Sequence, residues 1–287
     1  MNRKIVSPIK KVRKVTPPKV VEEPQEEFVE EIIEEPIIEE NFKDFREYLN
    51  VFEFECELPG SRQIVRFKPL TVKALKRALS YDGEISDAET LTSLFDDIFN
   101  IVVISEDFDP HDLLVFDRYT LLLEIRKKTK GEKSRFETTC PKCKSQSVQE
   151  IDYDNIKTIY PKEDINYNVT LTNDLSVNMK YITRRDELAI FKIVNGLKDL
   201  NKNQREAEAA IFLEASAIDE IITPQGPQDN ISIYDKKYLL ENLPQPLYQK
   251  IQKWHEENKF GPELEINLKC PHCEYNTVEN VSNFDFF

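Results

Sequence analysis

Glycine and histidine are scarce in this sequence, and each scarcity excludes a class of protein. Only 6 of the 287 residues are glycine, so the chain lacks the Gly-rich loops that cradle phosphates and the frequent tight turns of an all-β sandwich. It has only 3 histidines and contains no HExxH, GxSxG, Walker or GxGxxG sequence. The sequence therefore predicts a protein that is not an enzyme.

Long apolar runs and an excess of basic charge are missing too. No apolar stretch reaches the roughly 18 residues of a membrane span, and no apolar region follows the basic amino-terminal residues as it does in a signal peptide. The formal net charge is −14, so the surface as a whole repels phosphate backbones. We expect a soluble, unsecreted protein that does not bind membranes and is unsuited to general nucleic-acid binding.

The chain contains 17 phenylalanines and 11 tyrosines in stretches of both helical and strand periodicity, which favours a mixed α+β fold. We predict small β elements together with a helical bundle. One or two strands lie within residues 41–67, with a turn at Pro59-Gly60. Helices are predicted at residues 71–79, 86–100, 112–126, 183–194, 206–222, 234–242 and 247–258. Further strands are predicted at residues 134–139, 148–153, 168–171, 177–182 and 264–269.

The amino-terminal residues have a different composition from the rest. Residues 1–20 carry seven Lys or Arg and no acid, whereas residues 22–40 contain ten glutamates and no base. Such blocks have little apolar surface with which to offset ordering entropy, so residues 1–42 are predicted to be a disordered or extended tail. Pairs of apolar residues interrupt the acidic block, which is also typical of a segment that folds when it docks on a partner.

Four of the five cysteines form two matching motifs, Cys140-Pro141-Lys142-Cys143 and Cys270-Pro271-His272-Cys273. We call these the two CPxC knuckles. A two-residue spacer lets both thiolates of one pair reach the same tetrahedral cation, and two pairs complete its four ligands. We therefore predict a zinc ribbon in which Cys140, Cys143, Cys270 and Cys273 hold one structural Zn²⁺. A redox pair, a relic site without metal and two sites bridged between subunits are the alternatives.

The knuckles are separated by residues 144–269, far more than in an ordinary zinc ribbon. We accordingly predict an N-terminal α+β domain at residues 43–133 and a zinc-ribbon domain at residues 134–287. A helical insertion, at about residues 160–262, lies between the knuckles. Four thiolates leave no open position on the metal, so we expect an architectural rather than a catalytic zinc.

Other polar residues have simpler explanations than a functional site. His272 is expected to be exposed rather than a ligand, and Cys56 to pack as a small apolar residue in a strand. The acidic stretch that contains Asp109 and Asp112 is predicted to cap the helix that follows it. The pair Arg184-Arg185 either binds carboxylates of a partner or starts a helix as a solvated pair.

A basic run, residues 126–130, precedes the first knuckle. A zinc ribbon beside a basic patch is typical of nucleic-acid-binding proteins, so a nucleic-acid-binding or transcription accessory protein is the alternative to a protein-binding role. Cations that complement the carboxyl end of a helix are the simpler explanation of this run.

Two segments give the sequence a resemblance to a known family. They are Ile64-Val65-Arg66-Phe67-Lys68-Pro69-Leu70-Thr71-Val72-Lys73, and Phe116-Asp117-Arg118-Tyr119-Thr120-Leu121-Leu122-Leu123-Glu124-Ile125-Arg126 with Lys130-Gly131-Glu132 after it. Together with the helix pair between them, they resemble the baseplate protein family of T-even-type contractile phage tails. The resemblance covers roughly residues 50–155 and is weaker beyond. The long charged tail is not part of the family pattern, and only some relatives carry the cysteine pairs.

The resemblance implies a non-enzymatic protein of the baseplate hub, or one that assists hub assembly around the end of the tape measure protein. Its partners would then be other hub proteins or the tape measure, bound in part through the tail. Its location would be the virion baseplate, after assembly in the host cytoplasm.

Overall fold

The computed structural model describes residues 52–79 and 88–281 of the chain. Residues 50–287 form one unit that can be described by itself. The predicted tail, residues 1–42, lies outside the described residues, as does the expected start of the second helix at residue 86. The fold class is α+β, with small antiparallel sheets and seven helices in the described part of the chain.

The amino-terminal elements follow the predicted pattern and enclose the first apolar core. Strands β1 and β2 pair as an antiparallel hairpin around the predicted turn, and Thr71 caps the first helix by accepting a hydrogen bond from the Ala74 amide at 3.2 Å. The elements are β1 (Phe54–Glu57), β2 (Ile64–Phe67), α1 (Val72–Leu79), α2 (Ala88–Val102) and α3 (Val115–Lys130). Cys56 is buried in β1 and packs in this core, as predicted.

Helix α3 is buried around most of its circumference, which is typical of a central helix. Its Leu121, Leu122 and Ile125 pack in the first core, whereas Leu123 packs in a second apolar cluster at the base of two hairpins described below. Asp117 is fully buried and accepts hydrogen bonds from the Gly60 and Ser61 amides at 2.7 and 2.9 Å. Part of the segment that carries the family resemblance therefore holds the β1–β2 turn against α3.

The prediction that acids cap α3 was wrong. The residue before its first turn is Leu114, which makes no side-chain capping bond. Asp109 and Asp112 instead accept hydrogen bonds from the Arg185 guanidinium at 2.9 and 2.6 Å. Sequence spacing suggested a cap because both acids precede the helix, but the ion pairs with Arg185 come from a segment about 75 residues away.

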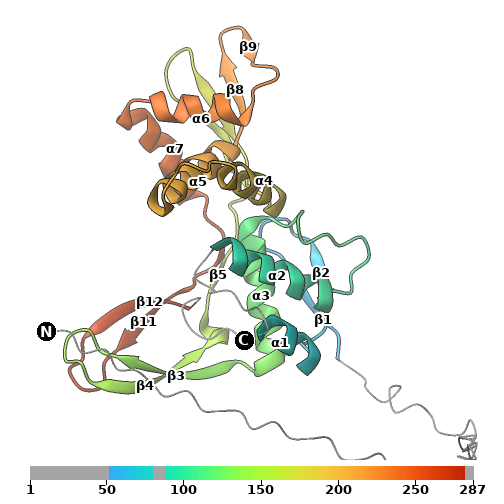
Figure 1. Cartoon of the computed structure of the whole chain (residues 1–287), viewed down its shortest axis with the longest axis vertical. Coiled ribbons are helices and arrows are strands. Elements are labelled where there is room, and N and C mark those ends of the chain that lie inside the picture. The colour runs from blue at the N-terminus through green and yellow to red at the C-terminus, as the bar shows by residue number, and fades with distance from the viewer. Residues whose placement is uncertain (1–51, 80–87, 282–287) are drawn as a thin grey trace, which may run out of the picture. The chain divides into compact units, whose positions relative to one another are not determined.

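The knuckles are the tips of two antiparallel hairpins, which lie side by side although the sequence separates them (Figure 1). The first hairpin consists of β3 (Lys133–Thr139) and β4 (Gln146–Asp152), and the second of β11 (Glu265–Lys269) and β12 (Asn276–Asn280). Both have the same register, since Thr139 pairs with Gln146 and Lys269 pairs with Asn276. The strands predicted before each knuckle are confirmed.

The chain between the hairpins contains a sheet as well as helices. Its four strands are antiparallel in the order β6-β7-β8-β9, and α5, α6 and α7 contribute residues to the apolar core of this part. The elements are a 3-10 turn (Tyr153–Asn155), β5 (Thr158–Ile159), β6 (Asn168–Thr170), β7 (Ser176–Met179), α4 (Arg184–Asn195), α5 (Lys202–Ser216), β8 (Ile218–Thr223), β9 (Gly226–Pro227), α6 (Ile233–Asn242), α7 (Gln245–Glu257) and β10 (Gly261–Pro262).

The single helix predicted over residues 206–222 was wrong in its second half. Helix α5 ends at Ser216, and β8 begins at Ile218. The apolar Ile221 fits a helical face in the sequence, but here it pairs with Val177 of β7 in the sheet. Tertiary pairing therefore outweighs the local helical preference of this segment.

Helix α4 begins at Arg184, as one of the two explanations expected, but Arg184 is neither solvated nor open to a partner. It is fully buried and donates to Asp96 and Glu187 at 2.9 and 3.1 Å. Arg118 of α3 donates to the same two carboxylates at 2.5 and 3.3 Å. We call these four residues the buried ion cluster. The buried ion cluster joins α2, α3 and α4. Arg185, which follows Arg184 in α4, lies outside the cluster and is exposed.

None of the helices in the described ranges is both long and apolar enough to cross a membrane.

Candidate metal centre

The two knuckles have the same local backbone structure. In the first, the Cys140 amide donates to the Ser145 carbonyl at 3.0 Å and the Lys144 amide donates to the Cys140 carbonyl at 2.9 Å. In the second, the corresponding bonds join Cys270 with residues 275 and 274, at 2.9 Å each. Lys144 and Glu274 both have a left-handed φ, of 60° and 56°. Each of these residues directly follows the second cysteine, so the left-handed conformation turns the chain back towards the return strand.

The two hairpins bring all four knuckle cysteines together. Their sulfur atoms all lie within 4.8 Å of one another, and the Sγ atoms of Cys140 and Cys273 are 3.7 Å apart, as are those of Cys143 and Cys270. A tetrahedral ion with metal–sulfur bonds of about 2.3 Å needs sulfur atoms separated by about 3.8 Å. The arrangement therefore has the dimensions of a tetrahedral thiolate site, with two ligands from each hairpin.

Without a cation, the pKa values of Cys143 and Cys273 are shifted in opposite directions. The hydroxyl and amide of Ser145 donate to Cys143 and lower its pKa to about 6. The amide of Tyr275 acts in the same direction on Cys273, but burial and the three neighbouring thiols outweigh it and raise the pKa of Cys273 to about 12. Four thiolates cannot share this space without a positive charge between them, and a dication supplies that charge.

Contacts behind the knuckles hold the hairpins against each other. The Gln149 side chain of β4 donates to the Lys269 carbonyl of β11 at 3.3 Å. Lys142 of the first knuckle lies over the Tyr275 ring of the second, with its Nζ 5.7 Å from the ring centroid. At the opposite end of the hairpins, Ile151 of β4 and Val281, which follows β12, share an apolar cluster with Leu123 of α3. The cysteine positions therefore depend on packing as well as on the knuckle turns.

Sequence reasoning found the four cysteines but missed the groups that donate hydrogen bonds to them. Ser145 and Tyr275 stand at the same place in the two knuckles, two residues after the second cysteine. The alignment of one knuckle with the other contains this signal, because the amide at this position faces a thiolate in both. His272 is exposed, as predicted.

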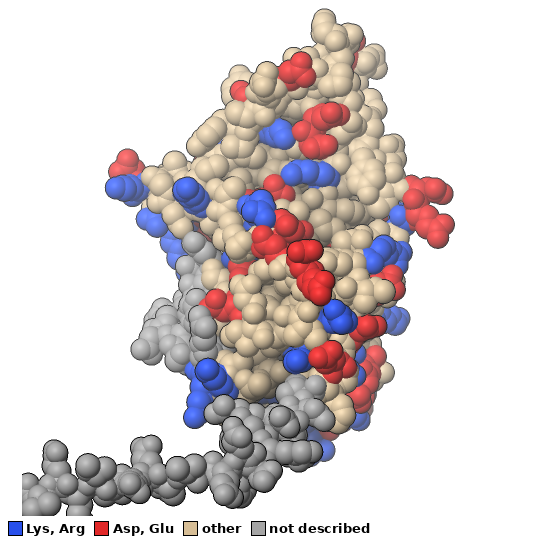
Figure 2. All heavy atoms as spheres, turned by 90° about the vertical axis from the view of Figure 1, so that its right-hand side faces the viewer, with Lys and Arg blue, Asp and Glu red and all other residues tan. Residues whose placement is uncertain are grey.

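Two residues of the basic run before the first knuckle, Arg126 and Lys127, contact other residues of the same chain. Arg126 is buried, donates to the Gly131 carbonyl and lies 3.8 Å from the centroid of the Tyr153 ring. Lys127 forms ion pairs with Glu124 and Asp154 at 2.7 and 2.9 Å. On the face shown in Figure 2, basic and acidic side chains are interspersed. These contacts favour the helix-terminus explanation over a phosphate-binding patch.

A comparison with models of protein families gave a match that covers most of the chain. The model described as T4 bacteriophage base plate protein matches residues 50–287. Neither the curated proteins nor the solved structures gave a match. The match extends the resemblance that was visible in residues 50–155 across both hairpins and the segment between them.

Proposed function

Because the chain belongs to the family of T4 bacteriophage base plate proteins, we propose that it serves the hub region of a contractile-tail baseplate, as a subunit or during hub assembly. Membership of the family gives it a structural role in the virion's tail baseplate. The hub assignment is supported by the resemblance of residues 64–73 and 116–126 to that family; in the second of these segments, Asp117 and Arg118 of α3 maintain the fold. We infer no catalytic role.

We further propose that Cys140, Cys143, Cys270 and Cys273 bind one structural Zn²⁺. The carrying observation is the clustering of four sulfur atoms at tetrahedral spacing. Thiolate sulfur suits zinc, and a closed set of four such ligands is typical of structural rather than catalytic sites. The zinc would supply the charge that allows all four thiols to ionise together.

Such an ion would act as a clamp on a long segment of chain. It joins the two ends of residues 144–269, which fold into their own sheet and helices. Cross-linking a loop of this length removes about 5 kcal/mol of conformational entropy from the unfolded chain by the loop-closure relation. The clamp therefore stabilises a platform for protein contacts, and its chemistry takes no part in those contacts.

Partner binding is proposed for hub proteins and the tape measure protein, with the amino-terminal tail, residues 1–42, as one binding segment. The tail carries a basic block followed by an acidic block with apolar pairs, and this composition suits a segment that gains its structure from a partner. A nucleic-acid partner is less well supported, because Arg126 and Lys127 of the basic run are engaged within the fold.

Metal analysis of the purified chain tests the zinc proposal. We expect one zinc per chain, and the Cys270→Ser variant should lose both the metal and the protection of residues 144–269 from protease. Cys56→Ser is the matched control, since this thiol is buried in β1 and away from the cluster. Zinc retained by Cys270→Ser, or lost equally from the control, would show that the knuckles do not form the site.

Assembly experiments test the hub proposal separately. The tagged chain should capture hub proteins or the tape measure protein from infected cells, and capture should weaken when residues 1–42 are removed. Mass spectrometry of purified virions then distinguishes a resident subunit from an assembly factor, which would be absent from them. Failure to capture either partner would refute the hub assignment while leaving family membership and the zinc site intact.

A further inference from the structure

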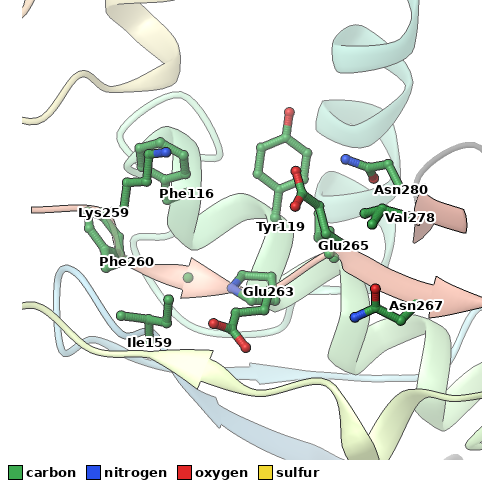
Figure 3. A pocket seen from close by; sticks show the side chains of 13 residues that line it. Phe116, Tyr119, Ile159, Lys259, Phe260, Glu263, Glu265, Asn267, Val278 and Asn280 are labelled. Carbon is green, nitrogen blue, oxygen red and sulfur yellow. The ribbon is translucent and has the colours of Figure 1, made fainter. Parts of the chain in front are cut away.

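A cleft of about 670 Å³ lies outside the metal centre, between the start of α3 and the outer face of the second hairpin. Figure 3 shows Phe116 and Phe260 on one side and Val278 and Asn280 on the other. This volume is within the range of sites that hold a ligand the size of a drug or a short peptide. None of the four knuckle cysteines lines it.

The walls of the cleft leave apolar side chains in contact with water. Phe116 and Ile159 are each 41% exposed, and Val278 is 59% exposed. Phe116 also packs edge-on against Phe260, with ring centroids 5.3 Å apart, so the cleft already has an aromatic wall. Exposed apolar side chains that converge on one hollow are characteristic of a surface that another apolar group covers.

The chain supplies such a group beside the cleft. Strand β12 contributes Val278 and Asn280 to the wall, and the next residue, Val281, is buried and donates its amide to the Leu264 carbonyl at 2.7 Å. The sequence continues as Ser282-Asn283-Phe284-Asp285-Phe286-Phe287, with three phenylalanines in six residues. We propose that this segment, residues 282–287, docks in the cleft of its own chain through its phenylalanine rings.

Reach and local concentration favour the chain's own segment over a separate occupant. Six extended residues span up to about 20 Å, and the segment starts from a fixed residue whose bonding partner, Leu264, lines the cleft. A short tether gives an effective concentration on the order of millimolar, which exceeds that of most free partners. In an extended chain, Phe284 and Phe286 point to one side and Asp285 to the other. Two rings can thus enter together while the carboxylate remains in water, near the exposed Lys259.

A competition experiment on the full chain tests this docking. The probe is a fluorescein-labelled peptide of residues 281–287, followed by anisotropy. It should bind the triple variant F284S/F286S/F287S, whose cleft is vacated, and should bind the wild-type chain about tenfold more weakly because the tethered segment occupies the site. No binding to the triple variant would overturn the proposal, and so would equal binding to both chains.

The two hairpins provide a matched control for the cleft wall. Val278 and Val148 both stand five residues after the second cysteine of their knuckle, are exposed to a similar degree and lie on the outer face of their hairpin. Only Val278 lines the cleft. Val278→Glu in the triple variant should abolish peptide binding, whereas Val148→Glu should preserve it. Equal loss in both would show that binding does not depend on the cleft.

A second measurement avoids the triple variant, in case it folds poorly. Chymotrypsin cleaves after phenylalanine, so a docked segment is protected, and mass spectrometry follows its removal. Cleavage within residues 284–287 should be several-fold faster in Val278→Glu than in the wild-type chain or in Val148→Glu. Equal cleavage rates would overturn the proposal. A wild-type dimer that dissociates on substitution of the phenylalanines would instead place the segment in a second copy, and would also overturn it.

Discussion

Replacing Arg184 by methionine should destabilise the fold strongly, whereas the same replacement at Arg185 should be nearly silent. The two arginines are adjacent in α4 and carry the same charge. Arg184 is fully buried between Asp96 and Glu187, while the Arg185 side chain is 61% exposed and pairs with acids that are themselves exposed. A comparison of the two variants therefore measures the effect of burial, because the charge and the position along the helix are nearly the same in both.

The magnitude follows from what Arg184→Met leaves behind. Two arginines and two carboxylates balance in the buried ion cluster, and loss of one arginine leaves one net negative charge in the interior. Removing one partner from a buried ion pair costs about 3–5 kcal/mol, since the remaining charge loses both its partner and access to water. Methionine occupies most of the vacated volume, so a cavity adds little. Exposed ion pairs such as those of Arg185 contribute little to stability because water and salt screen them.

Urea unfolding of the zinc-loaded chain, followed by circular dichroism, measures the effect. With a slope of about 2 kcal/mol per molar urea, the Arg184→Met midpoint should fall by roughly 1.5–2.5 M at an unchanged slope. The midpoint of Arg185→Met should remain close to that of the wild-type chain. Equal shifts in the two variants, or no shift in Arg184→Met, would show that the buried ion cluster does not hold α2, α3 and α4 together.

Three further results are expected. Zinc removal by a chelator should make the four knuckle thiols reactive towards an alkylating agent, and unchanged reactivity would contradict a metal-bound cluster. The pKa values of Tyr181 and Tyr248 are raised to about 12, chiefly by burial, so the unfolded chain loses these protons first and stability should fall between about pH 10 and 12. The double variant Y181F/Y248F should flatten this decline in urea midpoints, whereas the exposed-tyrosine control Y238F should not. Gly60→Ala should cost about 1–3 kcal/mol, because the added methyl group overlaps the Phe260 ring; an unchanged thermal midpoint would refute this reading.

Local patterns in the sequence were sufficient for much of the fold. The helices around α1, α2, α6 and α7 and the strands before each knuckle were predicted from periodicity and breaker residues, and the structure confirms them. The spacing within each knuckle was equally informative, because two residues between the cysteines allow both thiols to reach the same cation. Such features depend on neighbours within a few residues, which a single sequence displays directly.

The errors involve partners that are distant in the sequence. Asp112 was assigned to the helix beside it, but Arg185 is its partner. Arg184 was expected either in solvent or on a partner's carboxylates, but Asp96 and Glu187 of its own chain enclose it. The segment around Ile221 has helical composition and becomes a strand because β7 provides a pairing edge. The cleft beside α3 was not predicted at all, since its walls come from α3, β10 and the second hairpin.

The order in which a ribosome makes the chain gives the separated knuckles a further consequence. At about 5–20 residues per second, Cys270 is synthesised roughly 6–25 s after Cys143. Throughout this interval the nascent chain offers only two of the four knuckle thiols, half of a tetrahedral set. The sheet and helices between the hairpins can therefore form before the ion is enclosed. If the proposed ion binds, a chain that holds it is one whose two knuckles have both been made and brought together, on either side of residues 144–269.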